Sequence, residues 1–433
     1  MRTTMDVAVI GGGLAGLAAA TFLARAGRTV TLWEKAREVG GRAATQTKDG
    51  FHFNLGPHAL CRAGRGIQIL RELGVQFTGN MPGAAGGYAL DHGTLHTLPA
   101  GFVSLLTTGL LHLGGKLELA RLLGSIGKID TNPLQHTTVR EWLDRTLSQP
   151  NARQLVQALF RVATYTNDLE QQSAGAAIAQ LQLALSSNVL YLDGGWQTLV
   201  EGLRQAAETA GVQIISGEKV EAIEHDTIVQ GLRLADGSRR AVFTVIMTGS
   251  PMDAAALVQS EAKTLLQEWA ATARPVKAAC LDIGLACLPR PRARFALGID
   301  RPLYFSVHSA VAKLAPADGA VIHAAKYLHP TARTEPKADE RELEEVLDLM
   351  QPGWREVVVE RRFLPSMTVA HAVATATAGG LAGRPGPAVP GVRNLYIAGD
   401  WVGPEGLLAD ASLASAKRAA ELVMQNEGMK VAA

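Results

Sequence analysis

Residues 6–34 constrain the fold more than any other part of the chain. The β-branched run Asp6–Ile10 leads into the glycine turn Gly11–Gly16, and an apolar helical stretch follows. A second β-branched run, Thr29–Trp33, then ends at the acidic Glu34. This order predicts a strand, a helix and a second strand parallel to the first. The sequence therefore predicts a Rossmann-like, dinucleotide-binding unit at the start of an α/β fold.

The glycine turn is typical of a phosphate-binding loop. We expect Gly11 to permit the tight turn, Gly13 to let the backbone approach a pyrophosphate, and Gly16 to let the helix pack closely against the strand. The first helical residues, Leu14 and Ala15, would offer free N–H groups and the positive end of the helix dipole to a phosphate.

The acidic end of the second strand indicates which dinucleotide binds. The Glu34 carboxylate can accept both hydroxyls of an adenosine ribose, with Lys35 as a neighbouring contact. An acid here repels a 2′-phosphate, which favours FAD or NAD over NADP. The next loop contains Gly40-Gly41-Arg42, which suits a segment that folds over a pyrophosphate and neutralises it.

The opening motif together with Gly41-Arg42 resembles the flavoprotein superfamily of amine oxidases, phytoene desaturases and protoporphyrinogen oxidases. The loop Asn54–His58 and the strand end Gly399-Asp400 also match that superfamily, and the build is closest to bacterial phytoene-desaturase-like oxidoreductases. The resemblance covers the whole chain and implies FAD as the cofactor. The FAD contacts that it implies are Gly11, Gly13, Leu14, Ala15, Gly16, Glu34, Lys35, Gly41, Arg42, Gly56, Pro57, His58, Val220, Gly399, Asp400, Gly406, Leu407 and Leu408.

A chain of 433 residues can form two domains, each with its own core. We expect a discontinuous FAD-binding domain of residues 1–80, 190–250 and 390–433. It is interleaved with an α+β substrate domain of residues 81–189 and 251–389. Within these ranges the patterns predict a turn at His92-Gly93, and a hairpin of residues 228–234 and 241–247 in the FAD-binding domain.

The resemblance implies an FAD-dependent oxidoreductase that transfers a hydride from substrate to flavin N5, with oxygen or a quinone as the final acceptor. Aromatic residues make up only 5% of the chain, and one position of the amine oxidases' aromatic cage falls at the aliphatic Leu407-Leu408. Both features favour an apolar substrate, isoprenoid-derived or a secondary metabolite. Two alternatives stay open: a flavin amine oxidase producing hydrogen peroxide, and a non-catalytic prenyl or lipid carrier of the same fold.

Two residues are candidate catalytic groups. His58 lies in the loop near the flavin, and Lys277 begins a strand where amine oxidases carry a lysine that binds a water near N5. Each also has a structural interpretation, as a hydrogen-bonded loop histidine and a surface lysine. His323, Lys326 and Asp410 are further acid–base candidates, and no cluster of residues has metal-ligand spacing.

Charge and cysteine content bear on partners and location. The net charge of +2 gives no reason to expect nucleic acid as a partner. Cys61, Cys280 and Cys287 are too scattered for a disulfide framework, and we expect buried free thiols in a reducing cytoplasm. The apolar stretch 101–113 is too short to cross a bilayer. It predicts one helix, which either packs in the core or makes peripheral contact with a membrane.

Overall fold

The computed structural model describes residues 6–83, 87–258, 261–333 and 335–431. Its first layer is a parallel sheet in which every neighbouring pair of strands runs the same way. The strands, in spatial order, are β10 (Gln213–Ser216), β2 (Thr29–Glu34), β1 (Asp6–Ile10), β14 (Thr244–Met247) and β20 (Leu395–Ile397). The predicted α/β fold with a Rossmann-like sheet is confirmed.

Other elements cover both faces of this sheet, so its central strands β1 and β14 are largely apolar and buried. Val7 and Val9 of β1 face one core, while Ala8 between them faces the other. The helices on the first face are α1 (Leu14–Arg25), α2 (Arg65–Glu72), α8 (Gln197–Thr209) and α12 (Leu408–Val431). The second face carries a three-stranded sheet and two helices: β11 (Val220–His225), β12 (Val229–Leu234), β13 (Arg239–Ala241), α9 (Pro251–Leu257) and α10 (Glu261–Thr272).

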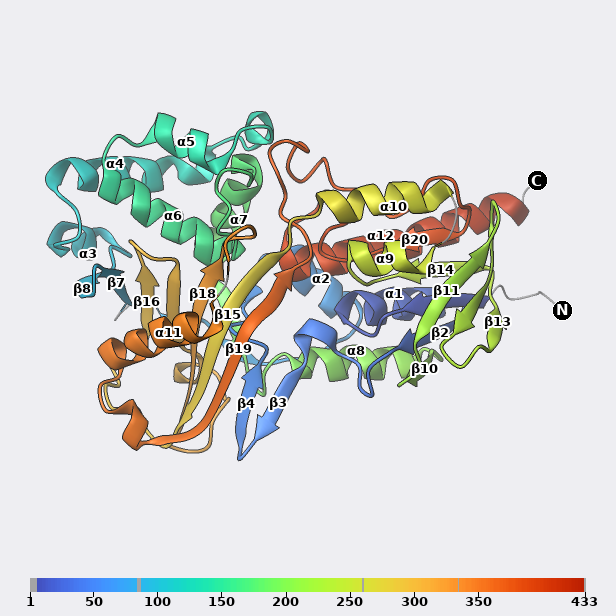
Figure 1. Cartoon of the computed structure of the whole chain (residues 1–433), viewed down its shortest axis with the longest axis horizontal. Helices are drawn as coiled ribbons and strands as arrows, with labels where there is room; N and C mark the ends of the chain where they lie inside the picture. The colour runs from blue at the N-terminus through green and yellow to red at the C-terminus, as the bar shows by residue number, and fades with distance from the viewer. Residues whose placement is uncertain (1–5, 84–86, 259–260, 334, 432–433) are drawn as a thin grey trace.

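A seven-stranded, mostly antiparallel sheet forms the second lobe (Figure 1). Its strands, in spatial order, are β19 (Val358–Ala370), β15 (Val276–Leu285), β18 (Ala320–Leu328), β17 (Leu303–Val307), β16 (Phe295–Gly298), β7 (Gly87–Asp91) and β8 (Thr94–Thr97). One face packs on α11 (Pro336–Met350). The other face packs on a helical group: α3 (Phe102–Thr107), α4 (Leu113–Ser125), α5 (Val139–Thr146), α6 (Pro150–Thr164) and α7 (Ala174–Ser187).

Short strands and turns complete the fold. The strands are β3 (Thr45–Lys48) with β4 (Phe51–Asn54), and β5 (Leu60–Cys61), β9 (Val189–Leu192) and β6 (Gly79–Asn80). The 3-10 turns are η1 (Gly41–Ala43), η2 (Ile126–Lys128), η3 (Asn132–Leu134), η4 (His308–Ala310) and η5 (Trp354–Glu356).

The parallel sheet takes its strands from three stretches of the chain, and the segments between them build the seven-stranded sheet. On this basis we propose that the division into domains given above describes the chain. The predicted turn at His92-Gly93 is confirmed, since both residues have positive φ (45° and 76°) between β7 and β8.

Three predictions about local structure are wrong. Residues 241–247 do not return beside β12 as one strand: β13 pairs with β12, whereas β14 joins the parallel sheet because all four of its residues are buried. Residues 101–113 do not form one helix, because α3 ends at Thr107 and α4 begins at Leu113. Cys287 is exposed rather than buried, whereas Cys280 is buried and Cys61 half-buried.

Candidate functional site

A cavity of about 890 Å³ connects the parallel sheet with the second lobe. Its floor includes Ile10, Trp33 and Met247, which are close to or at the carboxyl ends of β1, β2 and β14. In open α/β sheets, ligands bind outside the carboxyl ends of the strands. The cavity therefore lies where this fold places a nucleotide.

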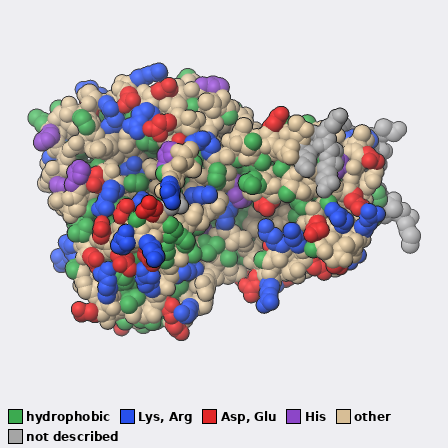
Figure 2. Space-filling view, viewed as in Figure 1, with side chains coloured by type: hydrophobic (Ala, Val, Ile, Leu, Met, Phe, Trp, Pro, Cys, Tyr) green, Lys and Arg blue, Asp and Glu red, His purple; other side chains and the backbone are tan. Residues whose placement is uncertain are grey.

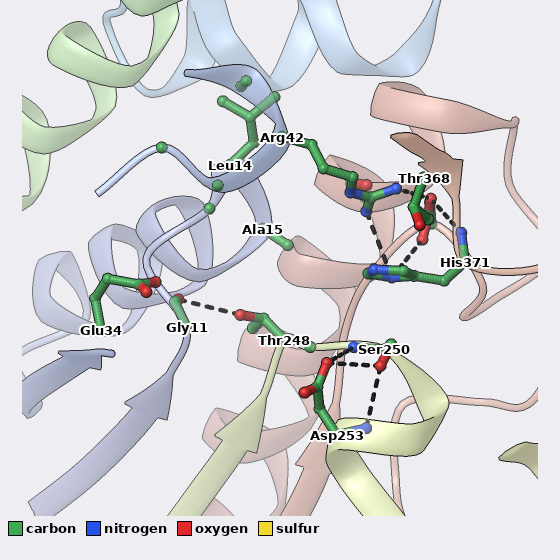
Figure 3. Close-up of a pocket in the computed structure, with 18 of the residues that line it drawn as sticks. Gly11, Leu14, Ala15, Glu34, Arg42, Thr248, Ser250, Asp253, Thr368 and His371 are labelled. Carbon is green, nitrogen blue, oxygen red and sulfur yellow. Dashed lines mark hydrogen bonds and ion pairs between the residues drawn. The ribbon is translucent and has the colours of Figure 1, made fainter. Parts of the chain in front are cut away.

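The glycine turn shapes one end of the cavity (Figure 3). Gly11 has φ +108°, and a Cβ on Gly16 would lie 1.8 Å from the Gly11 carbonyl oxygen. A Cβ on Gly13 would instead have the Gly40 carbonyl oxygen, 4.0 Å away, as its nearest neighbour. Gly16 thus allows close packing, while Gly13 leaves open space. Helix α1 has no side-chain cap, and Leu14 and Ala15 line the cavity, so its first N–H groups suit a phosphate.

Glu34 lies at the side of this turn with its carboxylate fixed by the backbone. Its Oε2 accepts the Gly12 N–H at 2.6 Å, and its Oε1 accepts the Ala36 N–H at 2.8 Å. Glu34, Lys35 and Val220 all line the cavity. These three residues are the ones for which the sequence predicts contacts with the ribose and the adenine.

A charged cluster lines the middle of the cavity. Arg42 Nη1 donates to Asp400 Oδ2 at 2.6 Å and to the Val369 carbonyl at 2.8 Å. His371 donates its backbone N–H to the same carboxylate oxygen at 3.1 Å, and its Nδ1 lies 3.2 Å from Oδ1. Burial alone would raise the pKa of Asp400, but Arg42 and His371 hold that pKa well below its usual range. The cluster therefore carries fixed charges beside the cavity.

Arg384 fixes the turn that follows β20. Its guanidinium donates to the carbonyl oxygens of Asp400 at 2.9 Å and Gly406 at 2.7 Å, and burial lowers its pKa to about 10. Helix α12 then starts at Leu408, which has the left-handed φ of +55°. Leu408 lines the cavity, so the start of α12 is held toward it.

The far wall of the cavity is largely apolar and takes residues from both lobes. It includes Leu55, Leu364 and Met367, with Tyr165 and Trp196 beside them. His58 also lines this wall. Its ring nitrogens lie 3.1 Å from the carbonyl oxygens of Gly56 and Arg42, and burial lowers its pKa to about 4. His58 is therefore a neutral, hydrogen-bonded side chain at physiological pH.

The comparisons with known proteins identify the family. The family model described as flavin containing amine oxidoreductase matches residues 14–279. This chain belongs to the flavin containing amine oxidoreductase family. The predicted superfamily is thereby confirmed, and the protein is a flavin-containing oxidoreductase.

Relatives of this flavin oxidoreductase include carotenoid-modifying enzymes. It is 54% identical over 52 residues to a carotenoid 3,4-desaturase of Haloarcula japonica, covering 12% of this chain and 10% of that protein. It is 24% identical over 272 residues to the 4,4′-diaponeurosporene oxygenase of Staphylococcus aureus, covering 54% of this chain and 53% of that protein. The matches thus span about half or less of the length of these relatives.

A solved structure supports the fold of this oxidoreductase. An oxidoreductase from Methanosarcina mazei superposes with a TM-score of 0.76 at 19% identity, covering 97% of this chain and 100% of the other. At that identity the likeness concerns the fold alone.

Most of the predicted cofactor contacts of the flavin oxidoreductase line the cavity, but several do not. Lys277, which was predicted as a catalytic residue, lies on β15 beside Leu328 and Thr368 of the neighbouring strands and does not line the cavity. Leu407 lines only a small adjoining cavity that Leu408 also reaches. Gly16, Gly56 and Gly406 likewise lie outside the lining.

The other acid–base candidates of the flavin oxidoreductase have structural partners. His323 Nδ1 lies 2.6 Å from Asp282 Oδ1 in the second lobe, and Lys326 Nζ donates to Asp339 Oδ1 at 2.7 Å. Asp410 accepts the Gly66 N–H at 2.6 Å, and burial raises its pKa to about 6. His323, Lys326 and Asp410 do not line the cavity.

Sequence reasoning missed residues that the flavin oxidoreductase places at the cavity. His371, Thr248, Ser250 and Asp253 all line it. Ser250 and Asp253 form the N-terminal capping box of α9, so both also have a local structural role. His371 follows the end of β19 in a segment without a motif, so no local pattern could have identified it.

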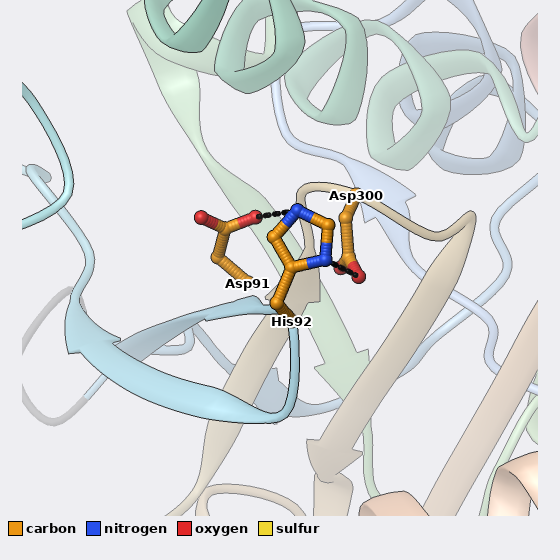
Figure 4. A group of neighbouring side chains, drawn as sticks. All are labelled: Asp91, His92 and Asp300. Carbon is orange, nitrogen blue, oxygen red and sulfur yellow. Dashed lines mark ion pairs between the residues drawn. The ribbon is translucent and has the colours of Figure 1, made fainter.

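Possible metal ligands converge at two places among the described residues of this flavin oxidoreductase. At the β7–β8 turn, His92 lies 3.9 Å from Asp91 and 3.5 Å from Asp300 (Figure 4). Near α6, Asp168 already accepts Arg274 Nε at 2.6 Å. Since a histidine or an arginine engages the carboxylates in each group, we describe both as ion-pair clusters.

Proposed function

We propose that this flavin oxidoreductase binds FAD and dehydrogenates an apolar small molecule. The observation that carries the proposal is the cavity itself, which runs from the nucleotide motif to a wall containing Leu55, Leu364 and Met367. Leu408 lines it close to the position where amine oxidases have a cage aromatic. The carotenoid-modifying names of two relatives support the same substrate class.

The chain's own residues would hold the cofactor by ordinary electrostatics. The start of α1 would bind phosphate, Glu34 would accept the adenosine ribose hydroxyls, and Val220 would lie against the adenine. Arg42 and Asp400 would face the middle of FAD. The acid at Glu34 and the combination with Arg42 favour FAD over NADP.

When bound, FAD supplies an acceptor for a hydride removed from substrate carbon. The apolar wall would orient the substrate and exclude water. His58 would contribute as a hydrogen-bonding group rather than as a general acid, because a pKa of about 4 leaves its ring neutral at neutral pH, with one N–H that can donate to a carbonyl oxygen. We propose oxygen or a quinone as the acceptor that reoxidises the enzyme.

An amine oxidase that produces hydrogen peroxide is the second candidate. The specific observation in its favour is that Tyr165 and Trp196 line the cavity beside His58. The face of an aromatic ring attracts a cationic amine. Lys277 gives no support, since its side chain does not line the cavity.

Anaerobic mixing of the purified holoprotein tests both candidates. We expect its absorption spectrum to show oxidised flavin, which bleaches on addition of a polyene but not of a polyamine or a cyclic amine. Bleaching by amines alone, with stoichiometric peroxide on admission of oxygen, would replace the first candidate with the second. A protein that cannot be loaded with FAD would overturn the cofactor assignment.

A further inference from the structure

Exposed apolar side chains concentrate on α3 and the start of α4. Eleven large apolar side chains are exposed among the described residues, and five of them fall in a stretch of sixteen residues. They are Phe102 (77% exposed), Val103 (71%), Leu106 (56%), Leu113 (74%) and Leu117 (61%). We call these five side chains the α3–α4 patch. Figure 1 places α3 and α4 at the end of the molecule away from both termini.

Helix α3 is apolar on two sides. Leu105 is buried against the second lobe, while Phe102, Val103 and Leu106 face outward. Helix α4 repeats the arrangement, with Leu119 and Leu122 buried and Leu113 and Leu117 exposed one turn apart. A helix that is apolar around most of its circumference is covered by something other than water.

The charged side chains of α3 and of the first half of α4 are two cations, Lys116 and Arg121, and one acid, Glu118. Glu118 is the only acid between residues 100 and 121, and its carboxylate accepts the backbone N–H groups of Ser148 and Gln149. Lys116 Nζ donates to the Leu106 carbonyl at 2.6 Å at the edge of the patch, and the exposed Arg121 follows Leu117 one turn later. The face of the molecule seen in Figure 2 mixes acidic and basic side chains.

From these features we infer that the α3–α4 patch docks on the surface of an anionic lipid bilayer. Apolar side chains with flanking cations and few acids are what an interfacial helix needs. A second copy of the chain fits less well, because a two-fold contact would bring the same cations together. Among the described residues no helix is long and apolar enough to cross a bilayer, so the contact is peripheral.

This inference deepens the proposed function and rests on it for its purpose, since an apolar substrate accumulates in a bilayer. The buried side chains of α3 and α4 belong to the hydrophobic cluster that extends to the cavity. Leu105 and Leu119 share one hydrophobic cluster with Tyr165, Leu364 and Met367, which line the cavity wall. A single hydrophobic cluster thus connects the helices that carry the α3–α4 patch with the wall of the cavity.

Vesicle flotation of the holoprotein tests the inference without any substrate. We expect binding to phosphatidylcholine vesicles that contain phosphatidylglycerol, and weaker binding at high salt or without the anionic lipid. The triple variant Phe102→Ser, Leu106→Ser, Leu117→Ser should bind about a thousandfold more weakly, since each side chain carries roughly a tenfold effect. Arg121→Gln should weaken binding by about fivefold.

The matched control is Met252→Ser with Phe243→Ser, which removes exposed apolar side chains (72% and 52%) from the other lobe. Both multiple variants should keep the flavin spectrum and the melting temperature of the wild type. Equal flotation of the wild type and the patch variant would overturn the inference. The inference would also be overturned if the wild type sediments as a dimer and the patch variant as a monomer, because the patch would then serve self-association. If the protein binds vesicles but does not oxidise a polyene, only the proposed function is overturned. If it oxidises a detergent-dispersed polyene but does not bind vesicles, only the docking surface is overturned.

Discussion

Individual glycines of the opening motif have separable effects in this structure. An added methyl group at Gly16 meets the Gly11 carbonyl oxygen at 1.8 Å, whereas at Gly13 its nearest neighbour is 4.0 Å away. At Gly16 the protein itself leaves no room for a methyl group. At Gly13 that room exists, and the pyrophosphate of a bound dinucleotide would occupy it.

The variants Gly13→Ala and Gly16→Ala should therefore fail in different ways. Gly13→Ala should keep its apoprotein melting temperature but bind FAD at least about tenfold more weakly, since its methyl group occupies the phosphate approach. Gly16→Ala should lose about 1–3 kcal/mol of folding free energy, because helix and strand must separate. Differential scanning fluorimetry of apoprotein and a flavin titration distinguish the two. Equal flavin affinity in Gly13→Ala and wild type would contradict the site.

Asp410 predicts a pH dependence of stability. Its folded pKa of about 6 exceeds the unfolded value of about 3.9, because burial disfavours the charge. The folded state thus binds the proton more tightly, and this contribution to stability is lost as the pH rises from about 4 to 6. Asp410→Asn should match the wild type near pH 4 and be more stable by about 1–3 kcal/mol at pH 7. Urea unfolding at both pH values checks this, with the exposed Asp318→Asn as control.

Among the elements, α1 and α12 both begin at the cavity, and each reaches it differently. The position where α1 begins is fixed by the glycine turn, which can be recognised in the sequence. The start of α12 depends on Arg384, which lies outside any regular element and binds two carbonyl oxygens of the preceding turn.

Arg384→Gln should loosen this turn without unfolding the sheet. We expect faster amide hydrogen exchange in residues 399–408 and flavin binding weaker by about tenfold, since two charge-assisted hydrogen bonds are lost. The exposed Arg393→Gln is the matched control and should behave as wild type. Unchanged exchange in residues 399–408 would show that Arg384 does not hold the turn.

The difference between these two helix starts shows which parts of the fold and of the candidate site could be predicted from the sequence. The strand–turn–helix pattern of residues 6–34 is local, so it predicted β1, α1 and β2 correctly. The pairing of β14 with β1 depends on a partner more than 200 residues away, and periodicity could not separate it from a hairpin. His371 lines the cavity and Arg384 holds the turn beside it, both through tertiary contacts to Asp400, so no spacing in the chain could identify them.

At the scale of the whole molecule, the cavity takes its lining from both lobes. A ligand that fills it contacts the glycine turn on one side and Leu364 and Met367 on the other. Binding to the folded state alone should therefore stabilise both lobes together.

Removal of the flavin should lower the melting temperature of the protein as one transition. At a free FAD concentration of about 100 times the dissociation constant, the stabilisation is about 2.7 kcal/mol. Calorimetry of holoprotein, deflavinated protein and protein reloaded with FAD measures this. Two separate transitions, only one of which responds to FAD, would show that a single lobe holds the cofactor.

The order of strands in the parallel sheet has a consequence for biosynthesis. Strand β14 lies between β1 and β20, and β20 and Asp400 come more than 140 residues after β14 in the chain. While the ribosome makes the intervening segment, the apolar β14 has one unpaired edge. Nascent chains of this protein therefore expose an apolar strand edge that is prone to aggregation and that chaperones would shield. The cofactor can lock the sheet only near the end of translation, so its supply should govern how much of the newly made protein escapes aggregation and degradation.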